Sequence, residues 1–255
     1  MHMRSKEIAA WLRGCASIAG AQGFVVGLSG GVDSAVVARL CQMAIPDRTV
    51  AVILPCHSDP RDEDDARLVA NQFELPVVRL DLGPAFDALA NDLKTSLGTL
   101  SAQFAAAAPP VDIAARVPLA NVKPRLRMAC LYFIANSLNY LVAGTGNRSE
   151  VSLGYFTKYG DGGVDVLPLG GLLKSEVRAL ARDLEVPPAI IDKAPSAGLW
   201  LGQTDEHEMG FTYADLERYL MDGPDAVAPA VALKIERLIR ASEHKRAMPP
   251  SPEAD

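Results

Sequence analysis

The sequence lacks the features that place a chain in a membrane, outside the cell or on nucleic acid. None of its apolar runs approaches the ~18 residues of a membrane span, and no apolar signal core follows the first residues. Basic charge is in deficit, because 31 acidic residues outnumber 25 basic ones and give a net charge of −6. A nucleic acid or an anionic membrane would favour a basic face. We therefore expect a cytoplasmic protein with neither partner.

Cysteine is scarce as well. The four cysteines stand at positions 15, 41, 56 and 130 and include no C-x-x-C pair, so neither a zinc site nor a disulfide framework is indicated. At 255 residues, 49% hydrophobic and 22% charged, the chain is long enough for one large α/β domain. We expect a single domain over residues 1–255.

Two common nucleotide-binding patterns are missing: the Gly-Lys-Ser/Thr end of a Walker A loop and the spacing of the dinucleotide fingerprint. The chain has instead Gly23-Phe-Val-Val-Gly-Leu-Ser-Gly-Gly-Val-Asp-Ser34, which predicts a buried strand, a glycine-rich turn and a helix start. Backbone N–H groups and the helix dipole can surround a phosphate there, and Ser29 adds a hydroxyl donor. Asp33 would repel phosphates unless a divalent cation lay between, so it indicates Mg²⁺. An ordinary glycine-rich turn is the alternative.

Strand and helix patterns alternate along the rest of the chain. Further strands are predicted at residues 49–54, 76–82 and 140–144, with a short fifth strand at 166–169. Amphipathic helices are predicted between and after them, among them 7–19, 121–134 and 174–184. This alternation is typical of a doubly wound α/β fold, here with a mainly five-stranded parallel sheet and helices on both faces.

Charged and irregular segments give further hypotheses. Four acids at 62–65 begin a predicted helix and look like a metal site, although the helix dipole and solvent also explain them. Three basic residues, Lys123, Arg125 and Arg127, stand at a helix start where the dipole disfavours cations; an anionic ligand would explain them, and solvated side chains are the alternative. Residues 98–118 and 200–213 are predicted as mobile surface segments.

Several segments, in this order and spacing, together resemble the ammonia-dependent NAD synthetases. They are Gly27–Ser34, Lys123–Met128, Gly144-Thr145 with Glu150, and Thr157–Gly162. The first is similar to the pyrophosphate loop of N-type ATP pyrophosphatases at large, whereas the last is much more specific. The similarity continues to 243–246 and so spans most of the chain. It implies an adenine nucleotide alpha hydrolase-like fold and a ligase that adenylates deamido-NAD with ATP and amidates it with ammonia, giving NAD, AMP and pyrophosphate.

The resemblance also implies roles for individual residues. ATP contacts would come from Gly27, Leu28, Ser29, Gly30, Gly31, Val32, Asp33, Ser34, Thr145, Lys174 and Ser196. Deamido-NAD contacts would come from Arg125, Lys158, Asp165, His244 and Lys245. Mg²⁺ would be held by Asp33 and Glu150. Ser196 stands where the family has threonine, and Pro124 stands where it has alanine.

The chemistry of the reaction adds expectations. Asp33 and Lys174 are expected to act in adenylation, where charge develops on pyrophosphate. A carboxylate near the acyl carbon would attract and deprotonate ammonium, and either Asp161 or Asp165 is a candidate.

The resemblance implies no glutaminase domain but does imply a homodimer. The neighbours Cys56 and His57 are the one pair that looks like a nucleophile with its base, but sequence adjacency does not supply a triad. The helix around 125–137 carries more apolar surface than one face needs, which agrees with a dimer interface.

Two other classes of function stay open. A different adenylating amidotransferase or thiolase of the same loop family would act on a purine or a transfer RNA, although the acidic composition counts against RNA. A nucleotide-binding regulator would keep the fold without turnover. Pyrophosphate release measured with each acceptor distinguishes these classes.

Overall fold

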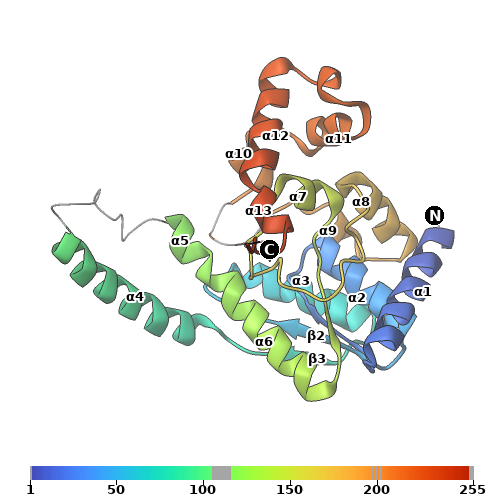
Figure 1. Cartoon of the computed structure of the whole chain (residues 1–255). Helices are drawn as coiled ribbons and strands as arrows, with labels where there is room; N and C mark the ends of the chain where they lie inside the picture. Colours follow the sequence, from blue (N-terminus) through green and yellow to red (C-terminus); the bar gives the residue numbers. More distant parts are fainter. Residues whose placement is uncertain (1, 105–115, 197, 199, 201–202, 253–255) are drawn as a thin grey trace.

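A parallel sheet of four strands forms the centre of the computed structural model, which describes residues 2–104, 116–196, 198, 200 and 203–252 (Figure 1). The strands are β1 (Phe24–Gly27), β2 (Thr49–Ile53), β3 (Val77–Arg79) and β4 (Leu141–Ala143), in the order β3-β2-β1-β4. Val26 lies between Ala51 and Ala143 in the register of the central strands. Because β1 is central, the glycine-rich loop that follows it opens at the middle of the carboxyl edge.

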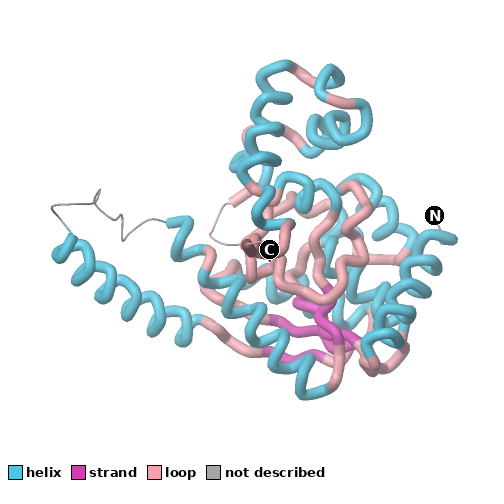
Figure 2. Tube along the Cα trace, in the orientation of Figure 1, coloured by secondary structure: helices cyan, strands magenta, loops and turns pink. Residues whose placement is uncertain are grey.

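Helices cover both faces of the sheet, as predicted (Figure 2). The larger apolar cluster holds Phe24 and Val26 of β1, and the smaller one on the opposite face holds Val25. The first face is covered by α1 (His2–Ala19), α2 (Val32–Ala44), α3 (Pro60–Gln72), α8 (Lys174–Asp183) and α9 (Pro188–Ile191). The second is covered mainly by α6 (Val122–Leu138). The alternation of inward side chains along β1 explains why its whole run is apolar.

The predicted fifth strand is wrong in extent. Among the described residues, this segment makes only one parallel bridge, between Ala143 and Val166. Pro168 has no N–H to continue a ladder, and the chain turns immediately, with Gly170 N donating to Leu167 O. The predicted strand at 76–82 is also shorter, because β3 is an exposed edge strand of three residues.

Both segments predicted to be mobile connections contain helices. Helix α4 (Gly83–Phe104) runs away from the body of the molecule, and α5 (Arg116–Ala120) leads back to α6 (Figure 1). The prediction of a mobile connection over 98–118 was therefore wrong at both of its ends. Residues 105–115 lie outside the described residues. The leucines of α4 at positions 89, 93, 97 and 100 follow helical spacing and are 37–42% exposed. In the second segment α10 (Asp205–Met209) forms and Gln203 is buried, while 201–202 are not described.

A helical layer stands over the carboxyl edge of the sheet (Figure 1). It contains α7 (Arg148–Leu153), α10, α11 (Tyr213–Asp222), a 3₁₀ turn (Pro224–Ala226), α12 (Pro229–Ala241) and α13 (Glu243–Arg246), and most of these share an apolar cluster around Leu216 and Ile235. In the described part of the chain no helix combines the length and apolarity needed to cross a membrane.

Candidate active site

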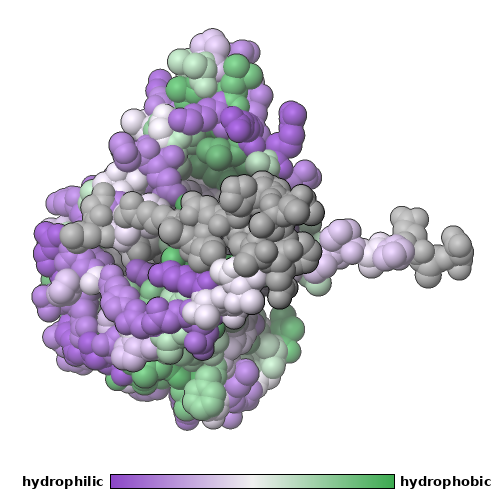
Figure 3. All heavy atoms as spheres, turned by 90° about the vertical axis from the view of Figure 1, so that its left-hand side faces the viewer, coloured by the Kyte–Doolittle hydropathy of each residue, from purple (hydrophilic) through white to green (hydrophobic). Residues whose placement is uncertain are grey.

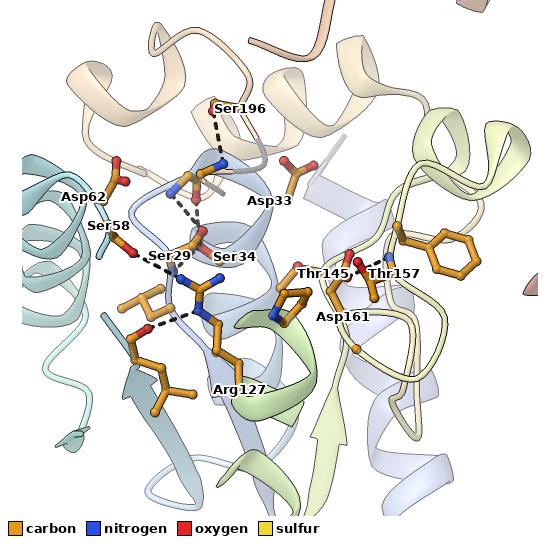
Figure 4. A pocket seen from close by; sticks show the side chains of 18 of the residues that line it. Ser29, Asp33, Ser34, Ser58, Asp62, Arg127, Thr145, Thr157, Asp161 and Ser196 are labelled. Carbon is orange, nitrogen blue, oxygen red and sulfur yellow. Dashed lines mark hydrogen bonds between the residues drawn. The ribbon is translucent and has the colours of Figure 1, made fainter. Parts of the chain in front are cut away.

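One cavity of about 940 Å³ lies at the carboxyl ends of the strands, between the sheet and the helical layer. Its walls come from the loops after β1, β2 and β4, from α6 and from residues 154–164 and 193–208 where described. Open parallel sheets bind their ligands at this edge. Figure 4 shows side chains from these separate segments pointing into one space.

The glycine-rich loop has the predicted strand, turn and helix, and its shape is held from within. Gly30 has φ +77°, and a Cβ there would lie 2.4 Å from Asp62 O, so only glycine fits. Ser34 Oγ donates to Gly31 O at 2.9 Å and lies 3.1 Å from Ser29 Oγ. These contacts fix the backbone N–H groups at the start of α2 in the arrangement that suits a phosphate.

An ammonium lies between two carboxylates beside this loop. Lys174 Nζ, at the first residue of α8, donates to Asp33 Oδ2 and lies 3.4 Å from Glu150 Oε1. Asn147 Nδ2 donates to the other Asp33 oxygen at 2.9 Å. Burial disfavours the charged form of Lys174, but the neighbouring charges of Asp33 and Glu150 outweigh it and raise its pKa. Desolvation raises the pKa of Glu150 to about 7, against the opposing effect of Lys174.

The donor set of this cluster fits Mg²⁺. Asp33 and Glu150 offer carboxylate oxygens on the cavity wall, and when both are ionised the cluster that they form with Lys174 carries one net negative charge. Mg²⁺ is commonly held by one or two carboxylates together with substrate phosphates and water. Within the described residues no group of three or more metal-ligating side chains occurs, so phosphates would have to complete the coordination.

The acids at 62–65 have other partners. Lys193 Nζ contacts Asp62 Oδ1 at 2.8 Å and Asp65 Oδ2 at 2.5 Å. Glu63, which also lines the cavity, pairs with Arg67 and Arg79. These contacts favour the interpretation of helix-start acids over that of a metal site.

The two candidate bases lie in different surroundings. Asp161 lines the cavity and accepts a hydrogen bond from Thr157 N at 2.9 Å; desolvation by the surrounding protein raises its pKa. Asp165 is not among the lining residues, because it accepts from Tyr132 Oη at 2.9 Å and from Val142 N at 2.8 Å. The cavity therefore presents Asp161 and not Asp165.

Four of the residues expected to contact deamido-NAD come together beside the cavity, and of these four Lys245 lines it. Arg125 Nη2 donates to Lys158 O at 3.3 Å, and Lys158 Nζ donates to His244 O at 2.5 Å. Lys245 Nζ donates to the carbonyls of residues 154 and 156, both at 2.8 Å, and desolvation lowers its pKa. The fifth, Asp165, accepts from Tyr132 Oη and Val142 N instead. The side chains of Arg125, Lys158 and Lys245 each donate to backbone carbonyls.

The three basic residues at the start of α6 go to different places. Lys123 is buried with its ammonium 5.5 Å from the centre of the Phe86 ring, and Arg125 is exposed. Arg127 lies in the cavity wall and donates to Leu54 O and Ser58 Oγ, both at 3.1 Å (Figure 4). Sequence reasoning noted the three together and did not separate them.

Thr145 and Ser196 also line the cavity. Ser196 Oγ accepts from Gly198 N at 3.1 Å, which shapes that turn. Asn147, which orients Asp33, was missed from the sequence. Its signal was available, since Asn147 and Glu150 form a capping box at the start of α7 with the spacing typical of that motif.

Comparisons with known proteins agree on one family. Residues 4–249 match the NAD synthase family. The chain is 49% identical to an NH(3)-dependent NAD(+) synthetase of Carboxydothermus hydrogenoformans over 98% of this chain and 96% of that protein. Among solved structures, an NMN synthetase from Francisella tularensis matches with a TM-score of 0.85 and 38% identity over 99% of this chain and 98% of the other. An NH3-dependent NAD synthetase from Campylobacter jejuni matches with a TM-score of 0.77 and 27% identity over 99% and 98%.

Proposed function

The chain belongs to the NAD synthase family and is an ammonia-dependent ligase that forms NAD; we propose that it does so by adenylating deamido-NAD with ATP. In the first step a carboxylate oxygen of deamido-NAD attacks the α-phosphorus of ATP, and the bond to the β-phosphate breaks. In the second step ammonia attacks the acyl carbon, and AMP leaves with the transferred oxygen. Adenylation is needed because oxide is not a leaving group.

The observation that carries this proposal is the cluster of Asp33, Lys174 and Glu150 beside a preformed glycine-rich loop. We call the loop Gly27–Ser34 with Glu150 and Lys174 the nucleotide end of the cavity. The loop N–H groups would hold the β- and γ-phosphates, and Lys174 would neutralise charge as pyrophosphate leaves. Preorganised donors of this kind contribute a few kcal/mol each to a transition state. Thr145 and Ser196 would contact the rest of ATP.

Asp33 and Glu150 would hold Mg²⁺ at this end. Its chemistry there would be to neutralise the phosphates and the charge that develops on pyrophosphate. The ammonium of Lys174 already lies between the same two carboxylates. Asp33 and Glu150 would therefore need only a small rearrangement to bind a second cation.

The nitrogen step requires neutral ammonia. Ammonium is the abundant form at neutral pH, and Asp161 is the carboxylate that faces the cavity. We assign Asp161 the role of attracting ammonium and accepting its proton. The raised pKa of this carboxyl makes it a stronger base than an exposed aspartate.

Deamido-NAD would enter at Arg125, Lys158, His244 and Lys245, which we call the acceptor end. Its two phosphates need cations, and within the described residues Arg125, Lys158 and Lys245 form no ion pair with a carboxylate within 4 Å. Asp165 would contribute from its position under Tyr132.

We also propose a homodimer that completes the acceptor end. Phe133 on α6 is 75% exposed, and the leucines of α4 are 37–42% exposed. Figure 3 shows apolar side chains gathered on the lower part of the face toward which α4 projects. An apolar patch of this kind marks an interface. The four cysteines are free thiols, which fits the proposed cytoplasmic location.

A second acceptor is favoured by one comparison. The NMN synthetase from Francisella tularensis is similar to this chain over nearly its whole length. NMN has the same amide as NAD on a shorter nucleotide, so the same chemistry would act on the mononucleotide of nicotinic acid. Competition between the two acceptors, measured as the ratio of kcat/KM, decides which one the enzyme prefers.

Pyrophosphate release with each acceptor tests the proposal. We expect release that depends on deamido-NAD and ammonium, with NAD as the product, and none with a purine nucleotide or transfer RNA. Nucleotide binding without release would identify a regulator and contradict the proposed reaction.

A further inference from the structure

Arg127 differs from the other cations of the cavity wall in what it contacts. Of the described lining residues, Lys174 and Lys193 pair with aspartates, Arg79 pairs with Glu63, and Lys245 binds carbonyls. Among the described residues, the side-chain hydrogen bonds of Arg127 go to one carbonyl and one hydroxyl, Leu54 O and Ser58 Oγ. Within the part of the chain that the structure describes, no carboxylate oxygen comes within 4 Å of its guanidinium.

A guanidinium without a counterion in this setting is costly. Burial lowers the pKa of Arg127, but an arginine stays charged in a protein. Removing an unpaired charge from water costs several kcal/mol unless an anion compensates. Of its five N–H donors, Nε–H and one on Nη2 are used by Leu54 O and Ser58 Oγ. The remaining ones are available to the cavity.

The anchor of Arg127 puts it next to the glycine-rich loop. Leu28 N, at the start of that loop, donates to Val52 O of β2 at 2.8 Å, and Leu54 is two residues farther along the same strand end. In Figure 4 the guanidinium points toward the side of the cavity that holds Ser29 and Ser34, with Asp161 on the other side. An anion at Arg127 would therefore lie between the phosphate loop and the proposed base.

We propose that Arg127 binds the α-phosphate of ATP and keeps its contact with that phosphate after pyrophosphate leaves. This inference rests on the proposed function, in which the loop takes the β- and γ-phosphates. The α-phosphate is the next group along ATP and is the one that must reach both the acceptor carboxylate and the site of ammonia attack. A guanidinium can bind two phosphate oxygens at once.

The nicotinate carboxylate is the other anion that reaches this region. Arg127 is a poor partner for it, because a bidentate guanidinium would withdraw charge from the oxygen that has to attack phosphorus. On the α-phosphate the same contact stabilises charge as the bond to pyrophosphate breaks, and again as AMP leaves.

The test compares the binding of AMP and adenosine, which differ only in this phosphate, by titration calorimetry. The wild-type enzyme should bind AMP more tightly than adenosine by about tenfold or more. Arg127→Gln should weaken AMP binding by about 10- to 100-fold, as expected for a hydrogen-bonded charge, and leave adenosine unchanged. Arg127→Lys keeps the positive charge but cannot bind two phosphate oxygens in the planar geometry of a guanidinium, and it should lose less AMP affinity than Arg127→Gln.

Two variants serve as matched controls. Ser58→Ala removes one internal partner of the guanidinium and should leave the ratio of AMP to adenosine affinity near that of the wild type. Arg125→Gln removes a charge from the same helix two residues away and should not change AMP affinity. Circular dichroism and the melting temperature show whether Arg127→Gln is folded; if it is not, Arg127→Lys alone carries the comparison.

An unchanged ratio of AMP to adenosine affinity in folded Arg127→Gln would overturn the proposal. So would a loss confined to deamido-NAD binding, which would assign Arg127 to the carboxylate. AMP binding needs neither acceptor nor turnover, so the result is independent of whether the full reaction runs as proposed.

Discussion

At the nucleotide end of the cavity the charged side chains form ion pairs with one another, whereas at the acceptor end the basic side chains donate hydrogen bonds to backbone carbonyls. Lys174 is shared by Asp33 and Glu150, and the three groups carry one net negative charge when both carboxylates are ionised. Lys158 and Lys245 donate to carbonyls, which carry no formal negative charge. The first end is therefore suited to a divalent cation with phosphates, and the second to an anion without a metal.

The two ends also differ in how complete they are within one chain. The nucleotide end is built on the central strand and on helices packed against the sheet. The acceptor end joins α6, residues 154–160 and α13, next to apolar side chains that have no cover. We infer that ATP chemistry needs one chain and that acceptor binding needs two.

Asp33→Asn should have the largest effect, because it removes the charge that both Lys174 and Mg²⁺ require. We expect kcat/KM to fall by about 10²- to 10³-fold while the fold is kept. Steady-state rates across a Mg²⁺ titration measure this, with Glu63→Gln as a control for losing a cavity carboxylate that pairs with Arg67 and Arg79 and not with Lys174. Near-normal activity of Asp33→Asn at limiting Mg²⁺ would remove the metal assignment.

Asp161→Asn should separate the two chemical steps. Amidation is expected to slow by about 10²- to 10⁴-fold through loss of the base, while exchange of labelled pyrophosphate into ATP continues, because adenylation does not use this carboxylate. Asp165→Asn is the comparison and should lose less, chiefly as a higher KM for deamido-NAD. Equal loss of exchange and amidation in Asp161→Asn would contradict the assignment.

Phe133→Glu tests whether the acceptor end needs a second chain. A charge at this 75% exposed position should weaken dimerisation by about 30-fold or more, raise the KM for deamido-NAD and leave AMP binding unchanged. Sedimentation velocity and calorimetry measure the two effects. Ile18→Glu, at a 91% exposed position on α1, is the matched control. A monomeric Phe133→Glu enzyme with normal acceptor kinetics would show that the interface has no part in the site.

Glu150→Gln should stabilise the enzyme in the absence of Mg²⁺. The folded-state pKa of about 7 lies above the unfolded value of 4.5, so ionisation disfavours folding increasingly as pH rises from 4.5 to 7. We expect Glu150→Gln to be more stable by about 3 kcal/mol at pH 8, a gain that shrinks as pH falls toward 4.5. Thermal melts at the two pH values check this. A Glu150→Gln variant that is less stable than the wild type at pH 8 would mean that the attraction of Lys174 fully offsets the cost of burying the Glu150 charge.

Cys56→Ala should have the smallest effect. Desolvation raises the pKa of the buried thiol, which makes it a weak nucleophile, and His57 is engaged with Asp87 at 2.8 Å. We expect less than about a twofold change in the ammonia-dependent rate and almost no NAD from glutamine. Glutamine-driven synthesis at a comparable rate, abolished in Cys56→Ala, would reveal a glutaminase.

The sequence predicted the nucleotide end better than the acceptor end for a physical reason. Residues 23–34 form a strand, turn and helix that are local in sequence, so glycine and apolar spacing suffice to predict them. The contact of Arg125 with Lys158 and that of Lys158 with His244 join residues 33 and 86 positions apart, and no local pattern encodes them.

The features that the sequence did not predict correctly also depend on context beyond a local pattern. The helix at 98–104 was hidden by the alanines and prolines that follow it, and the fifth strand was overpredicted because one apolar run contains Pro168. Asp161 lines the cavity and Asp165 does not, and this difference depends on the hydrogen bonds of Asp165 with Tyr132 and Val142, which are remote in sequence. The family resemblance proposed the set of residues, and the structure showed how the surroundings of its members differ.

Oxygen transfer tests the central claim of adenylation most directly. Deamido-NAD labelled with ¹⁸O in both carboxylate oxygens is converted with ammonium and ATP, and the products are separated and weighed by mass spectrometry. The account predicts one ¹⁸O in the phosphate of AMP and none in pyrophosphate, because the attacking oxygen stays on the α-phosphorus. Label in pyrophosphate, or AMP that carries none, would contradict it.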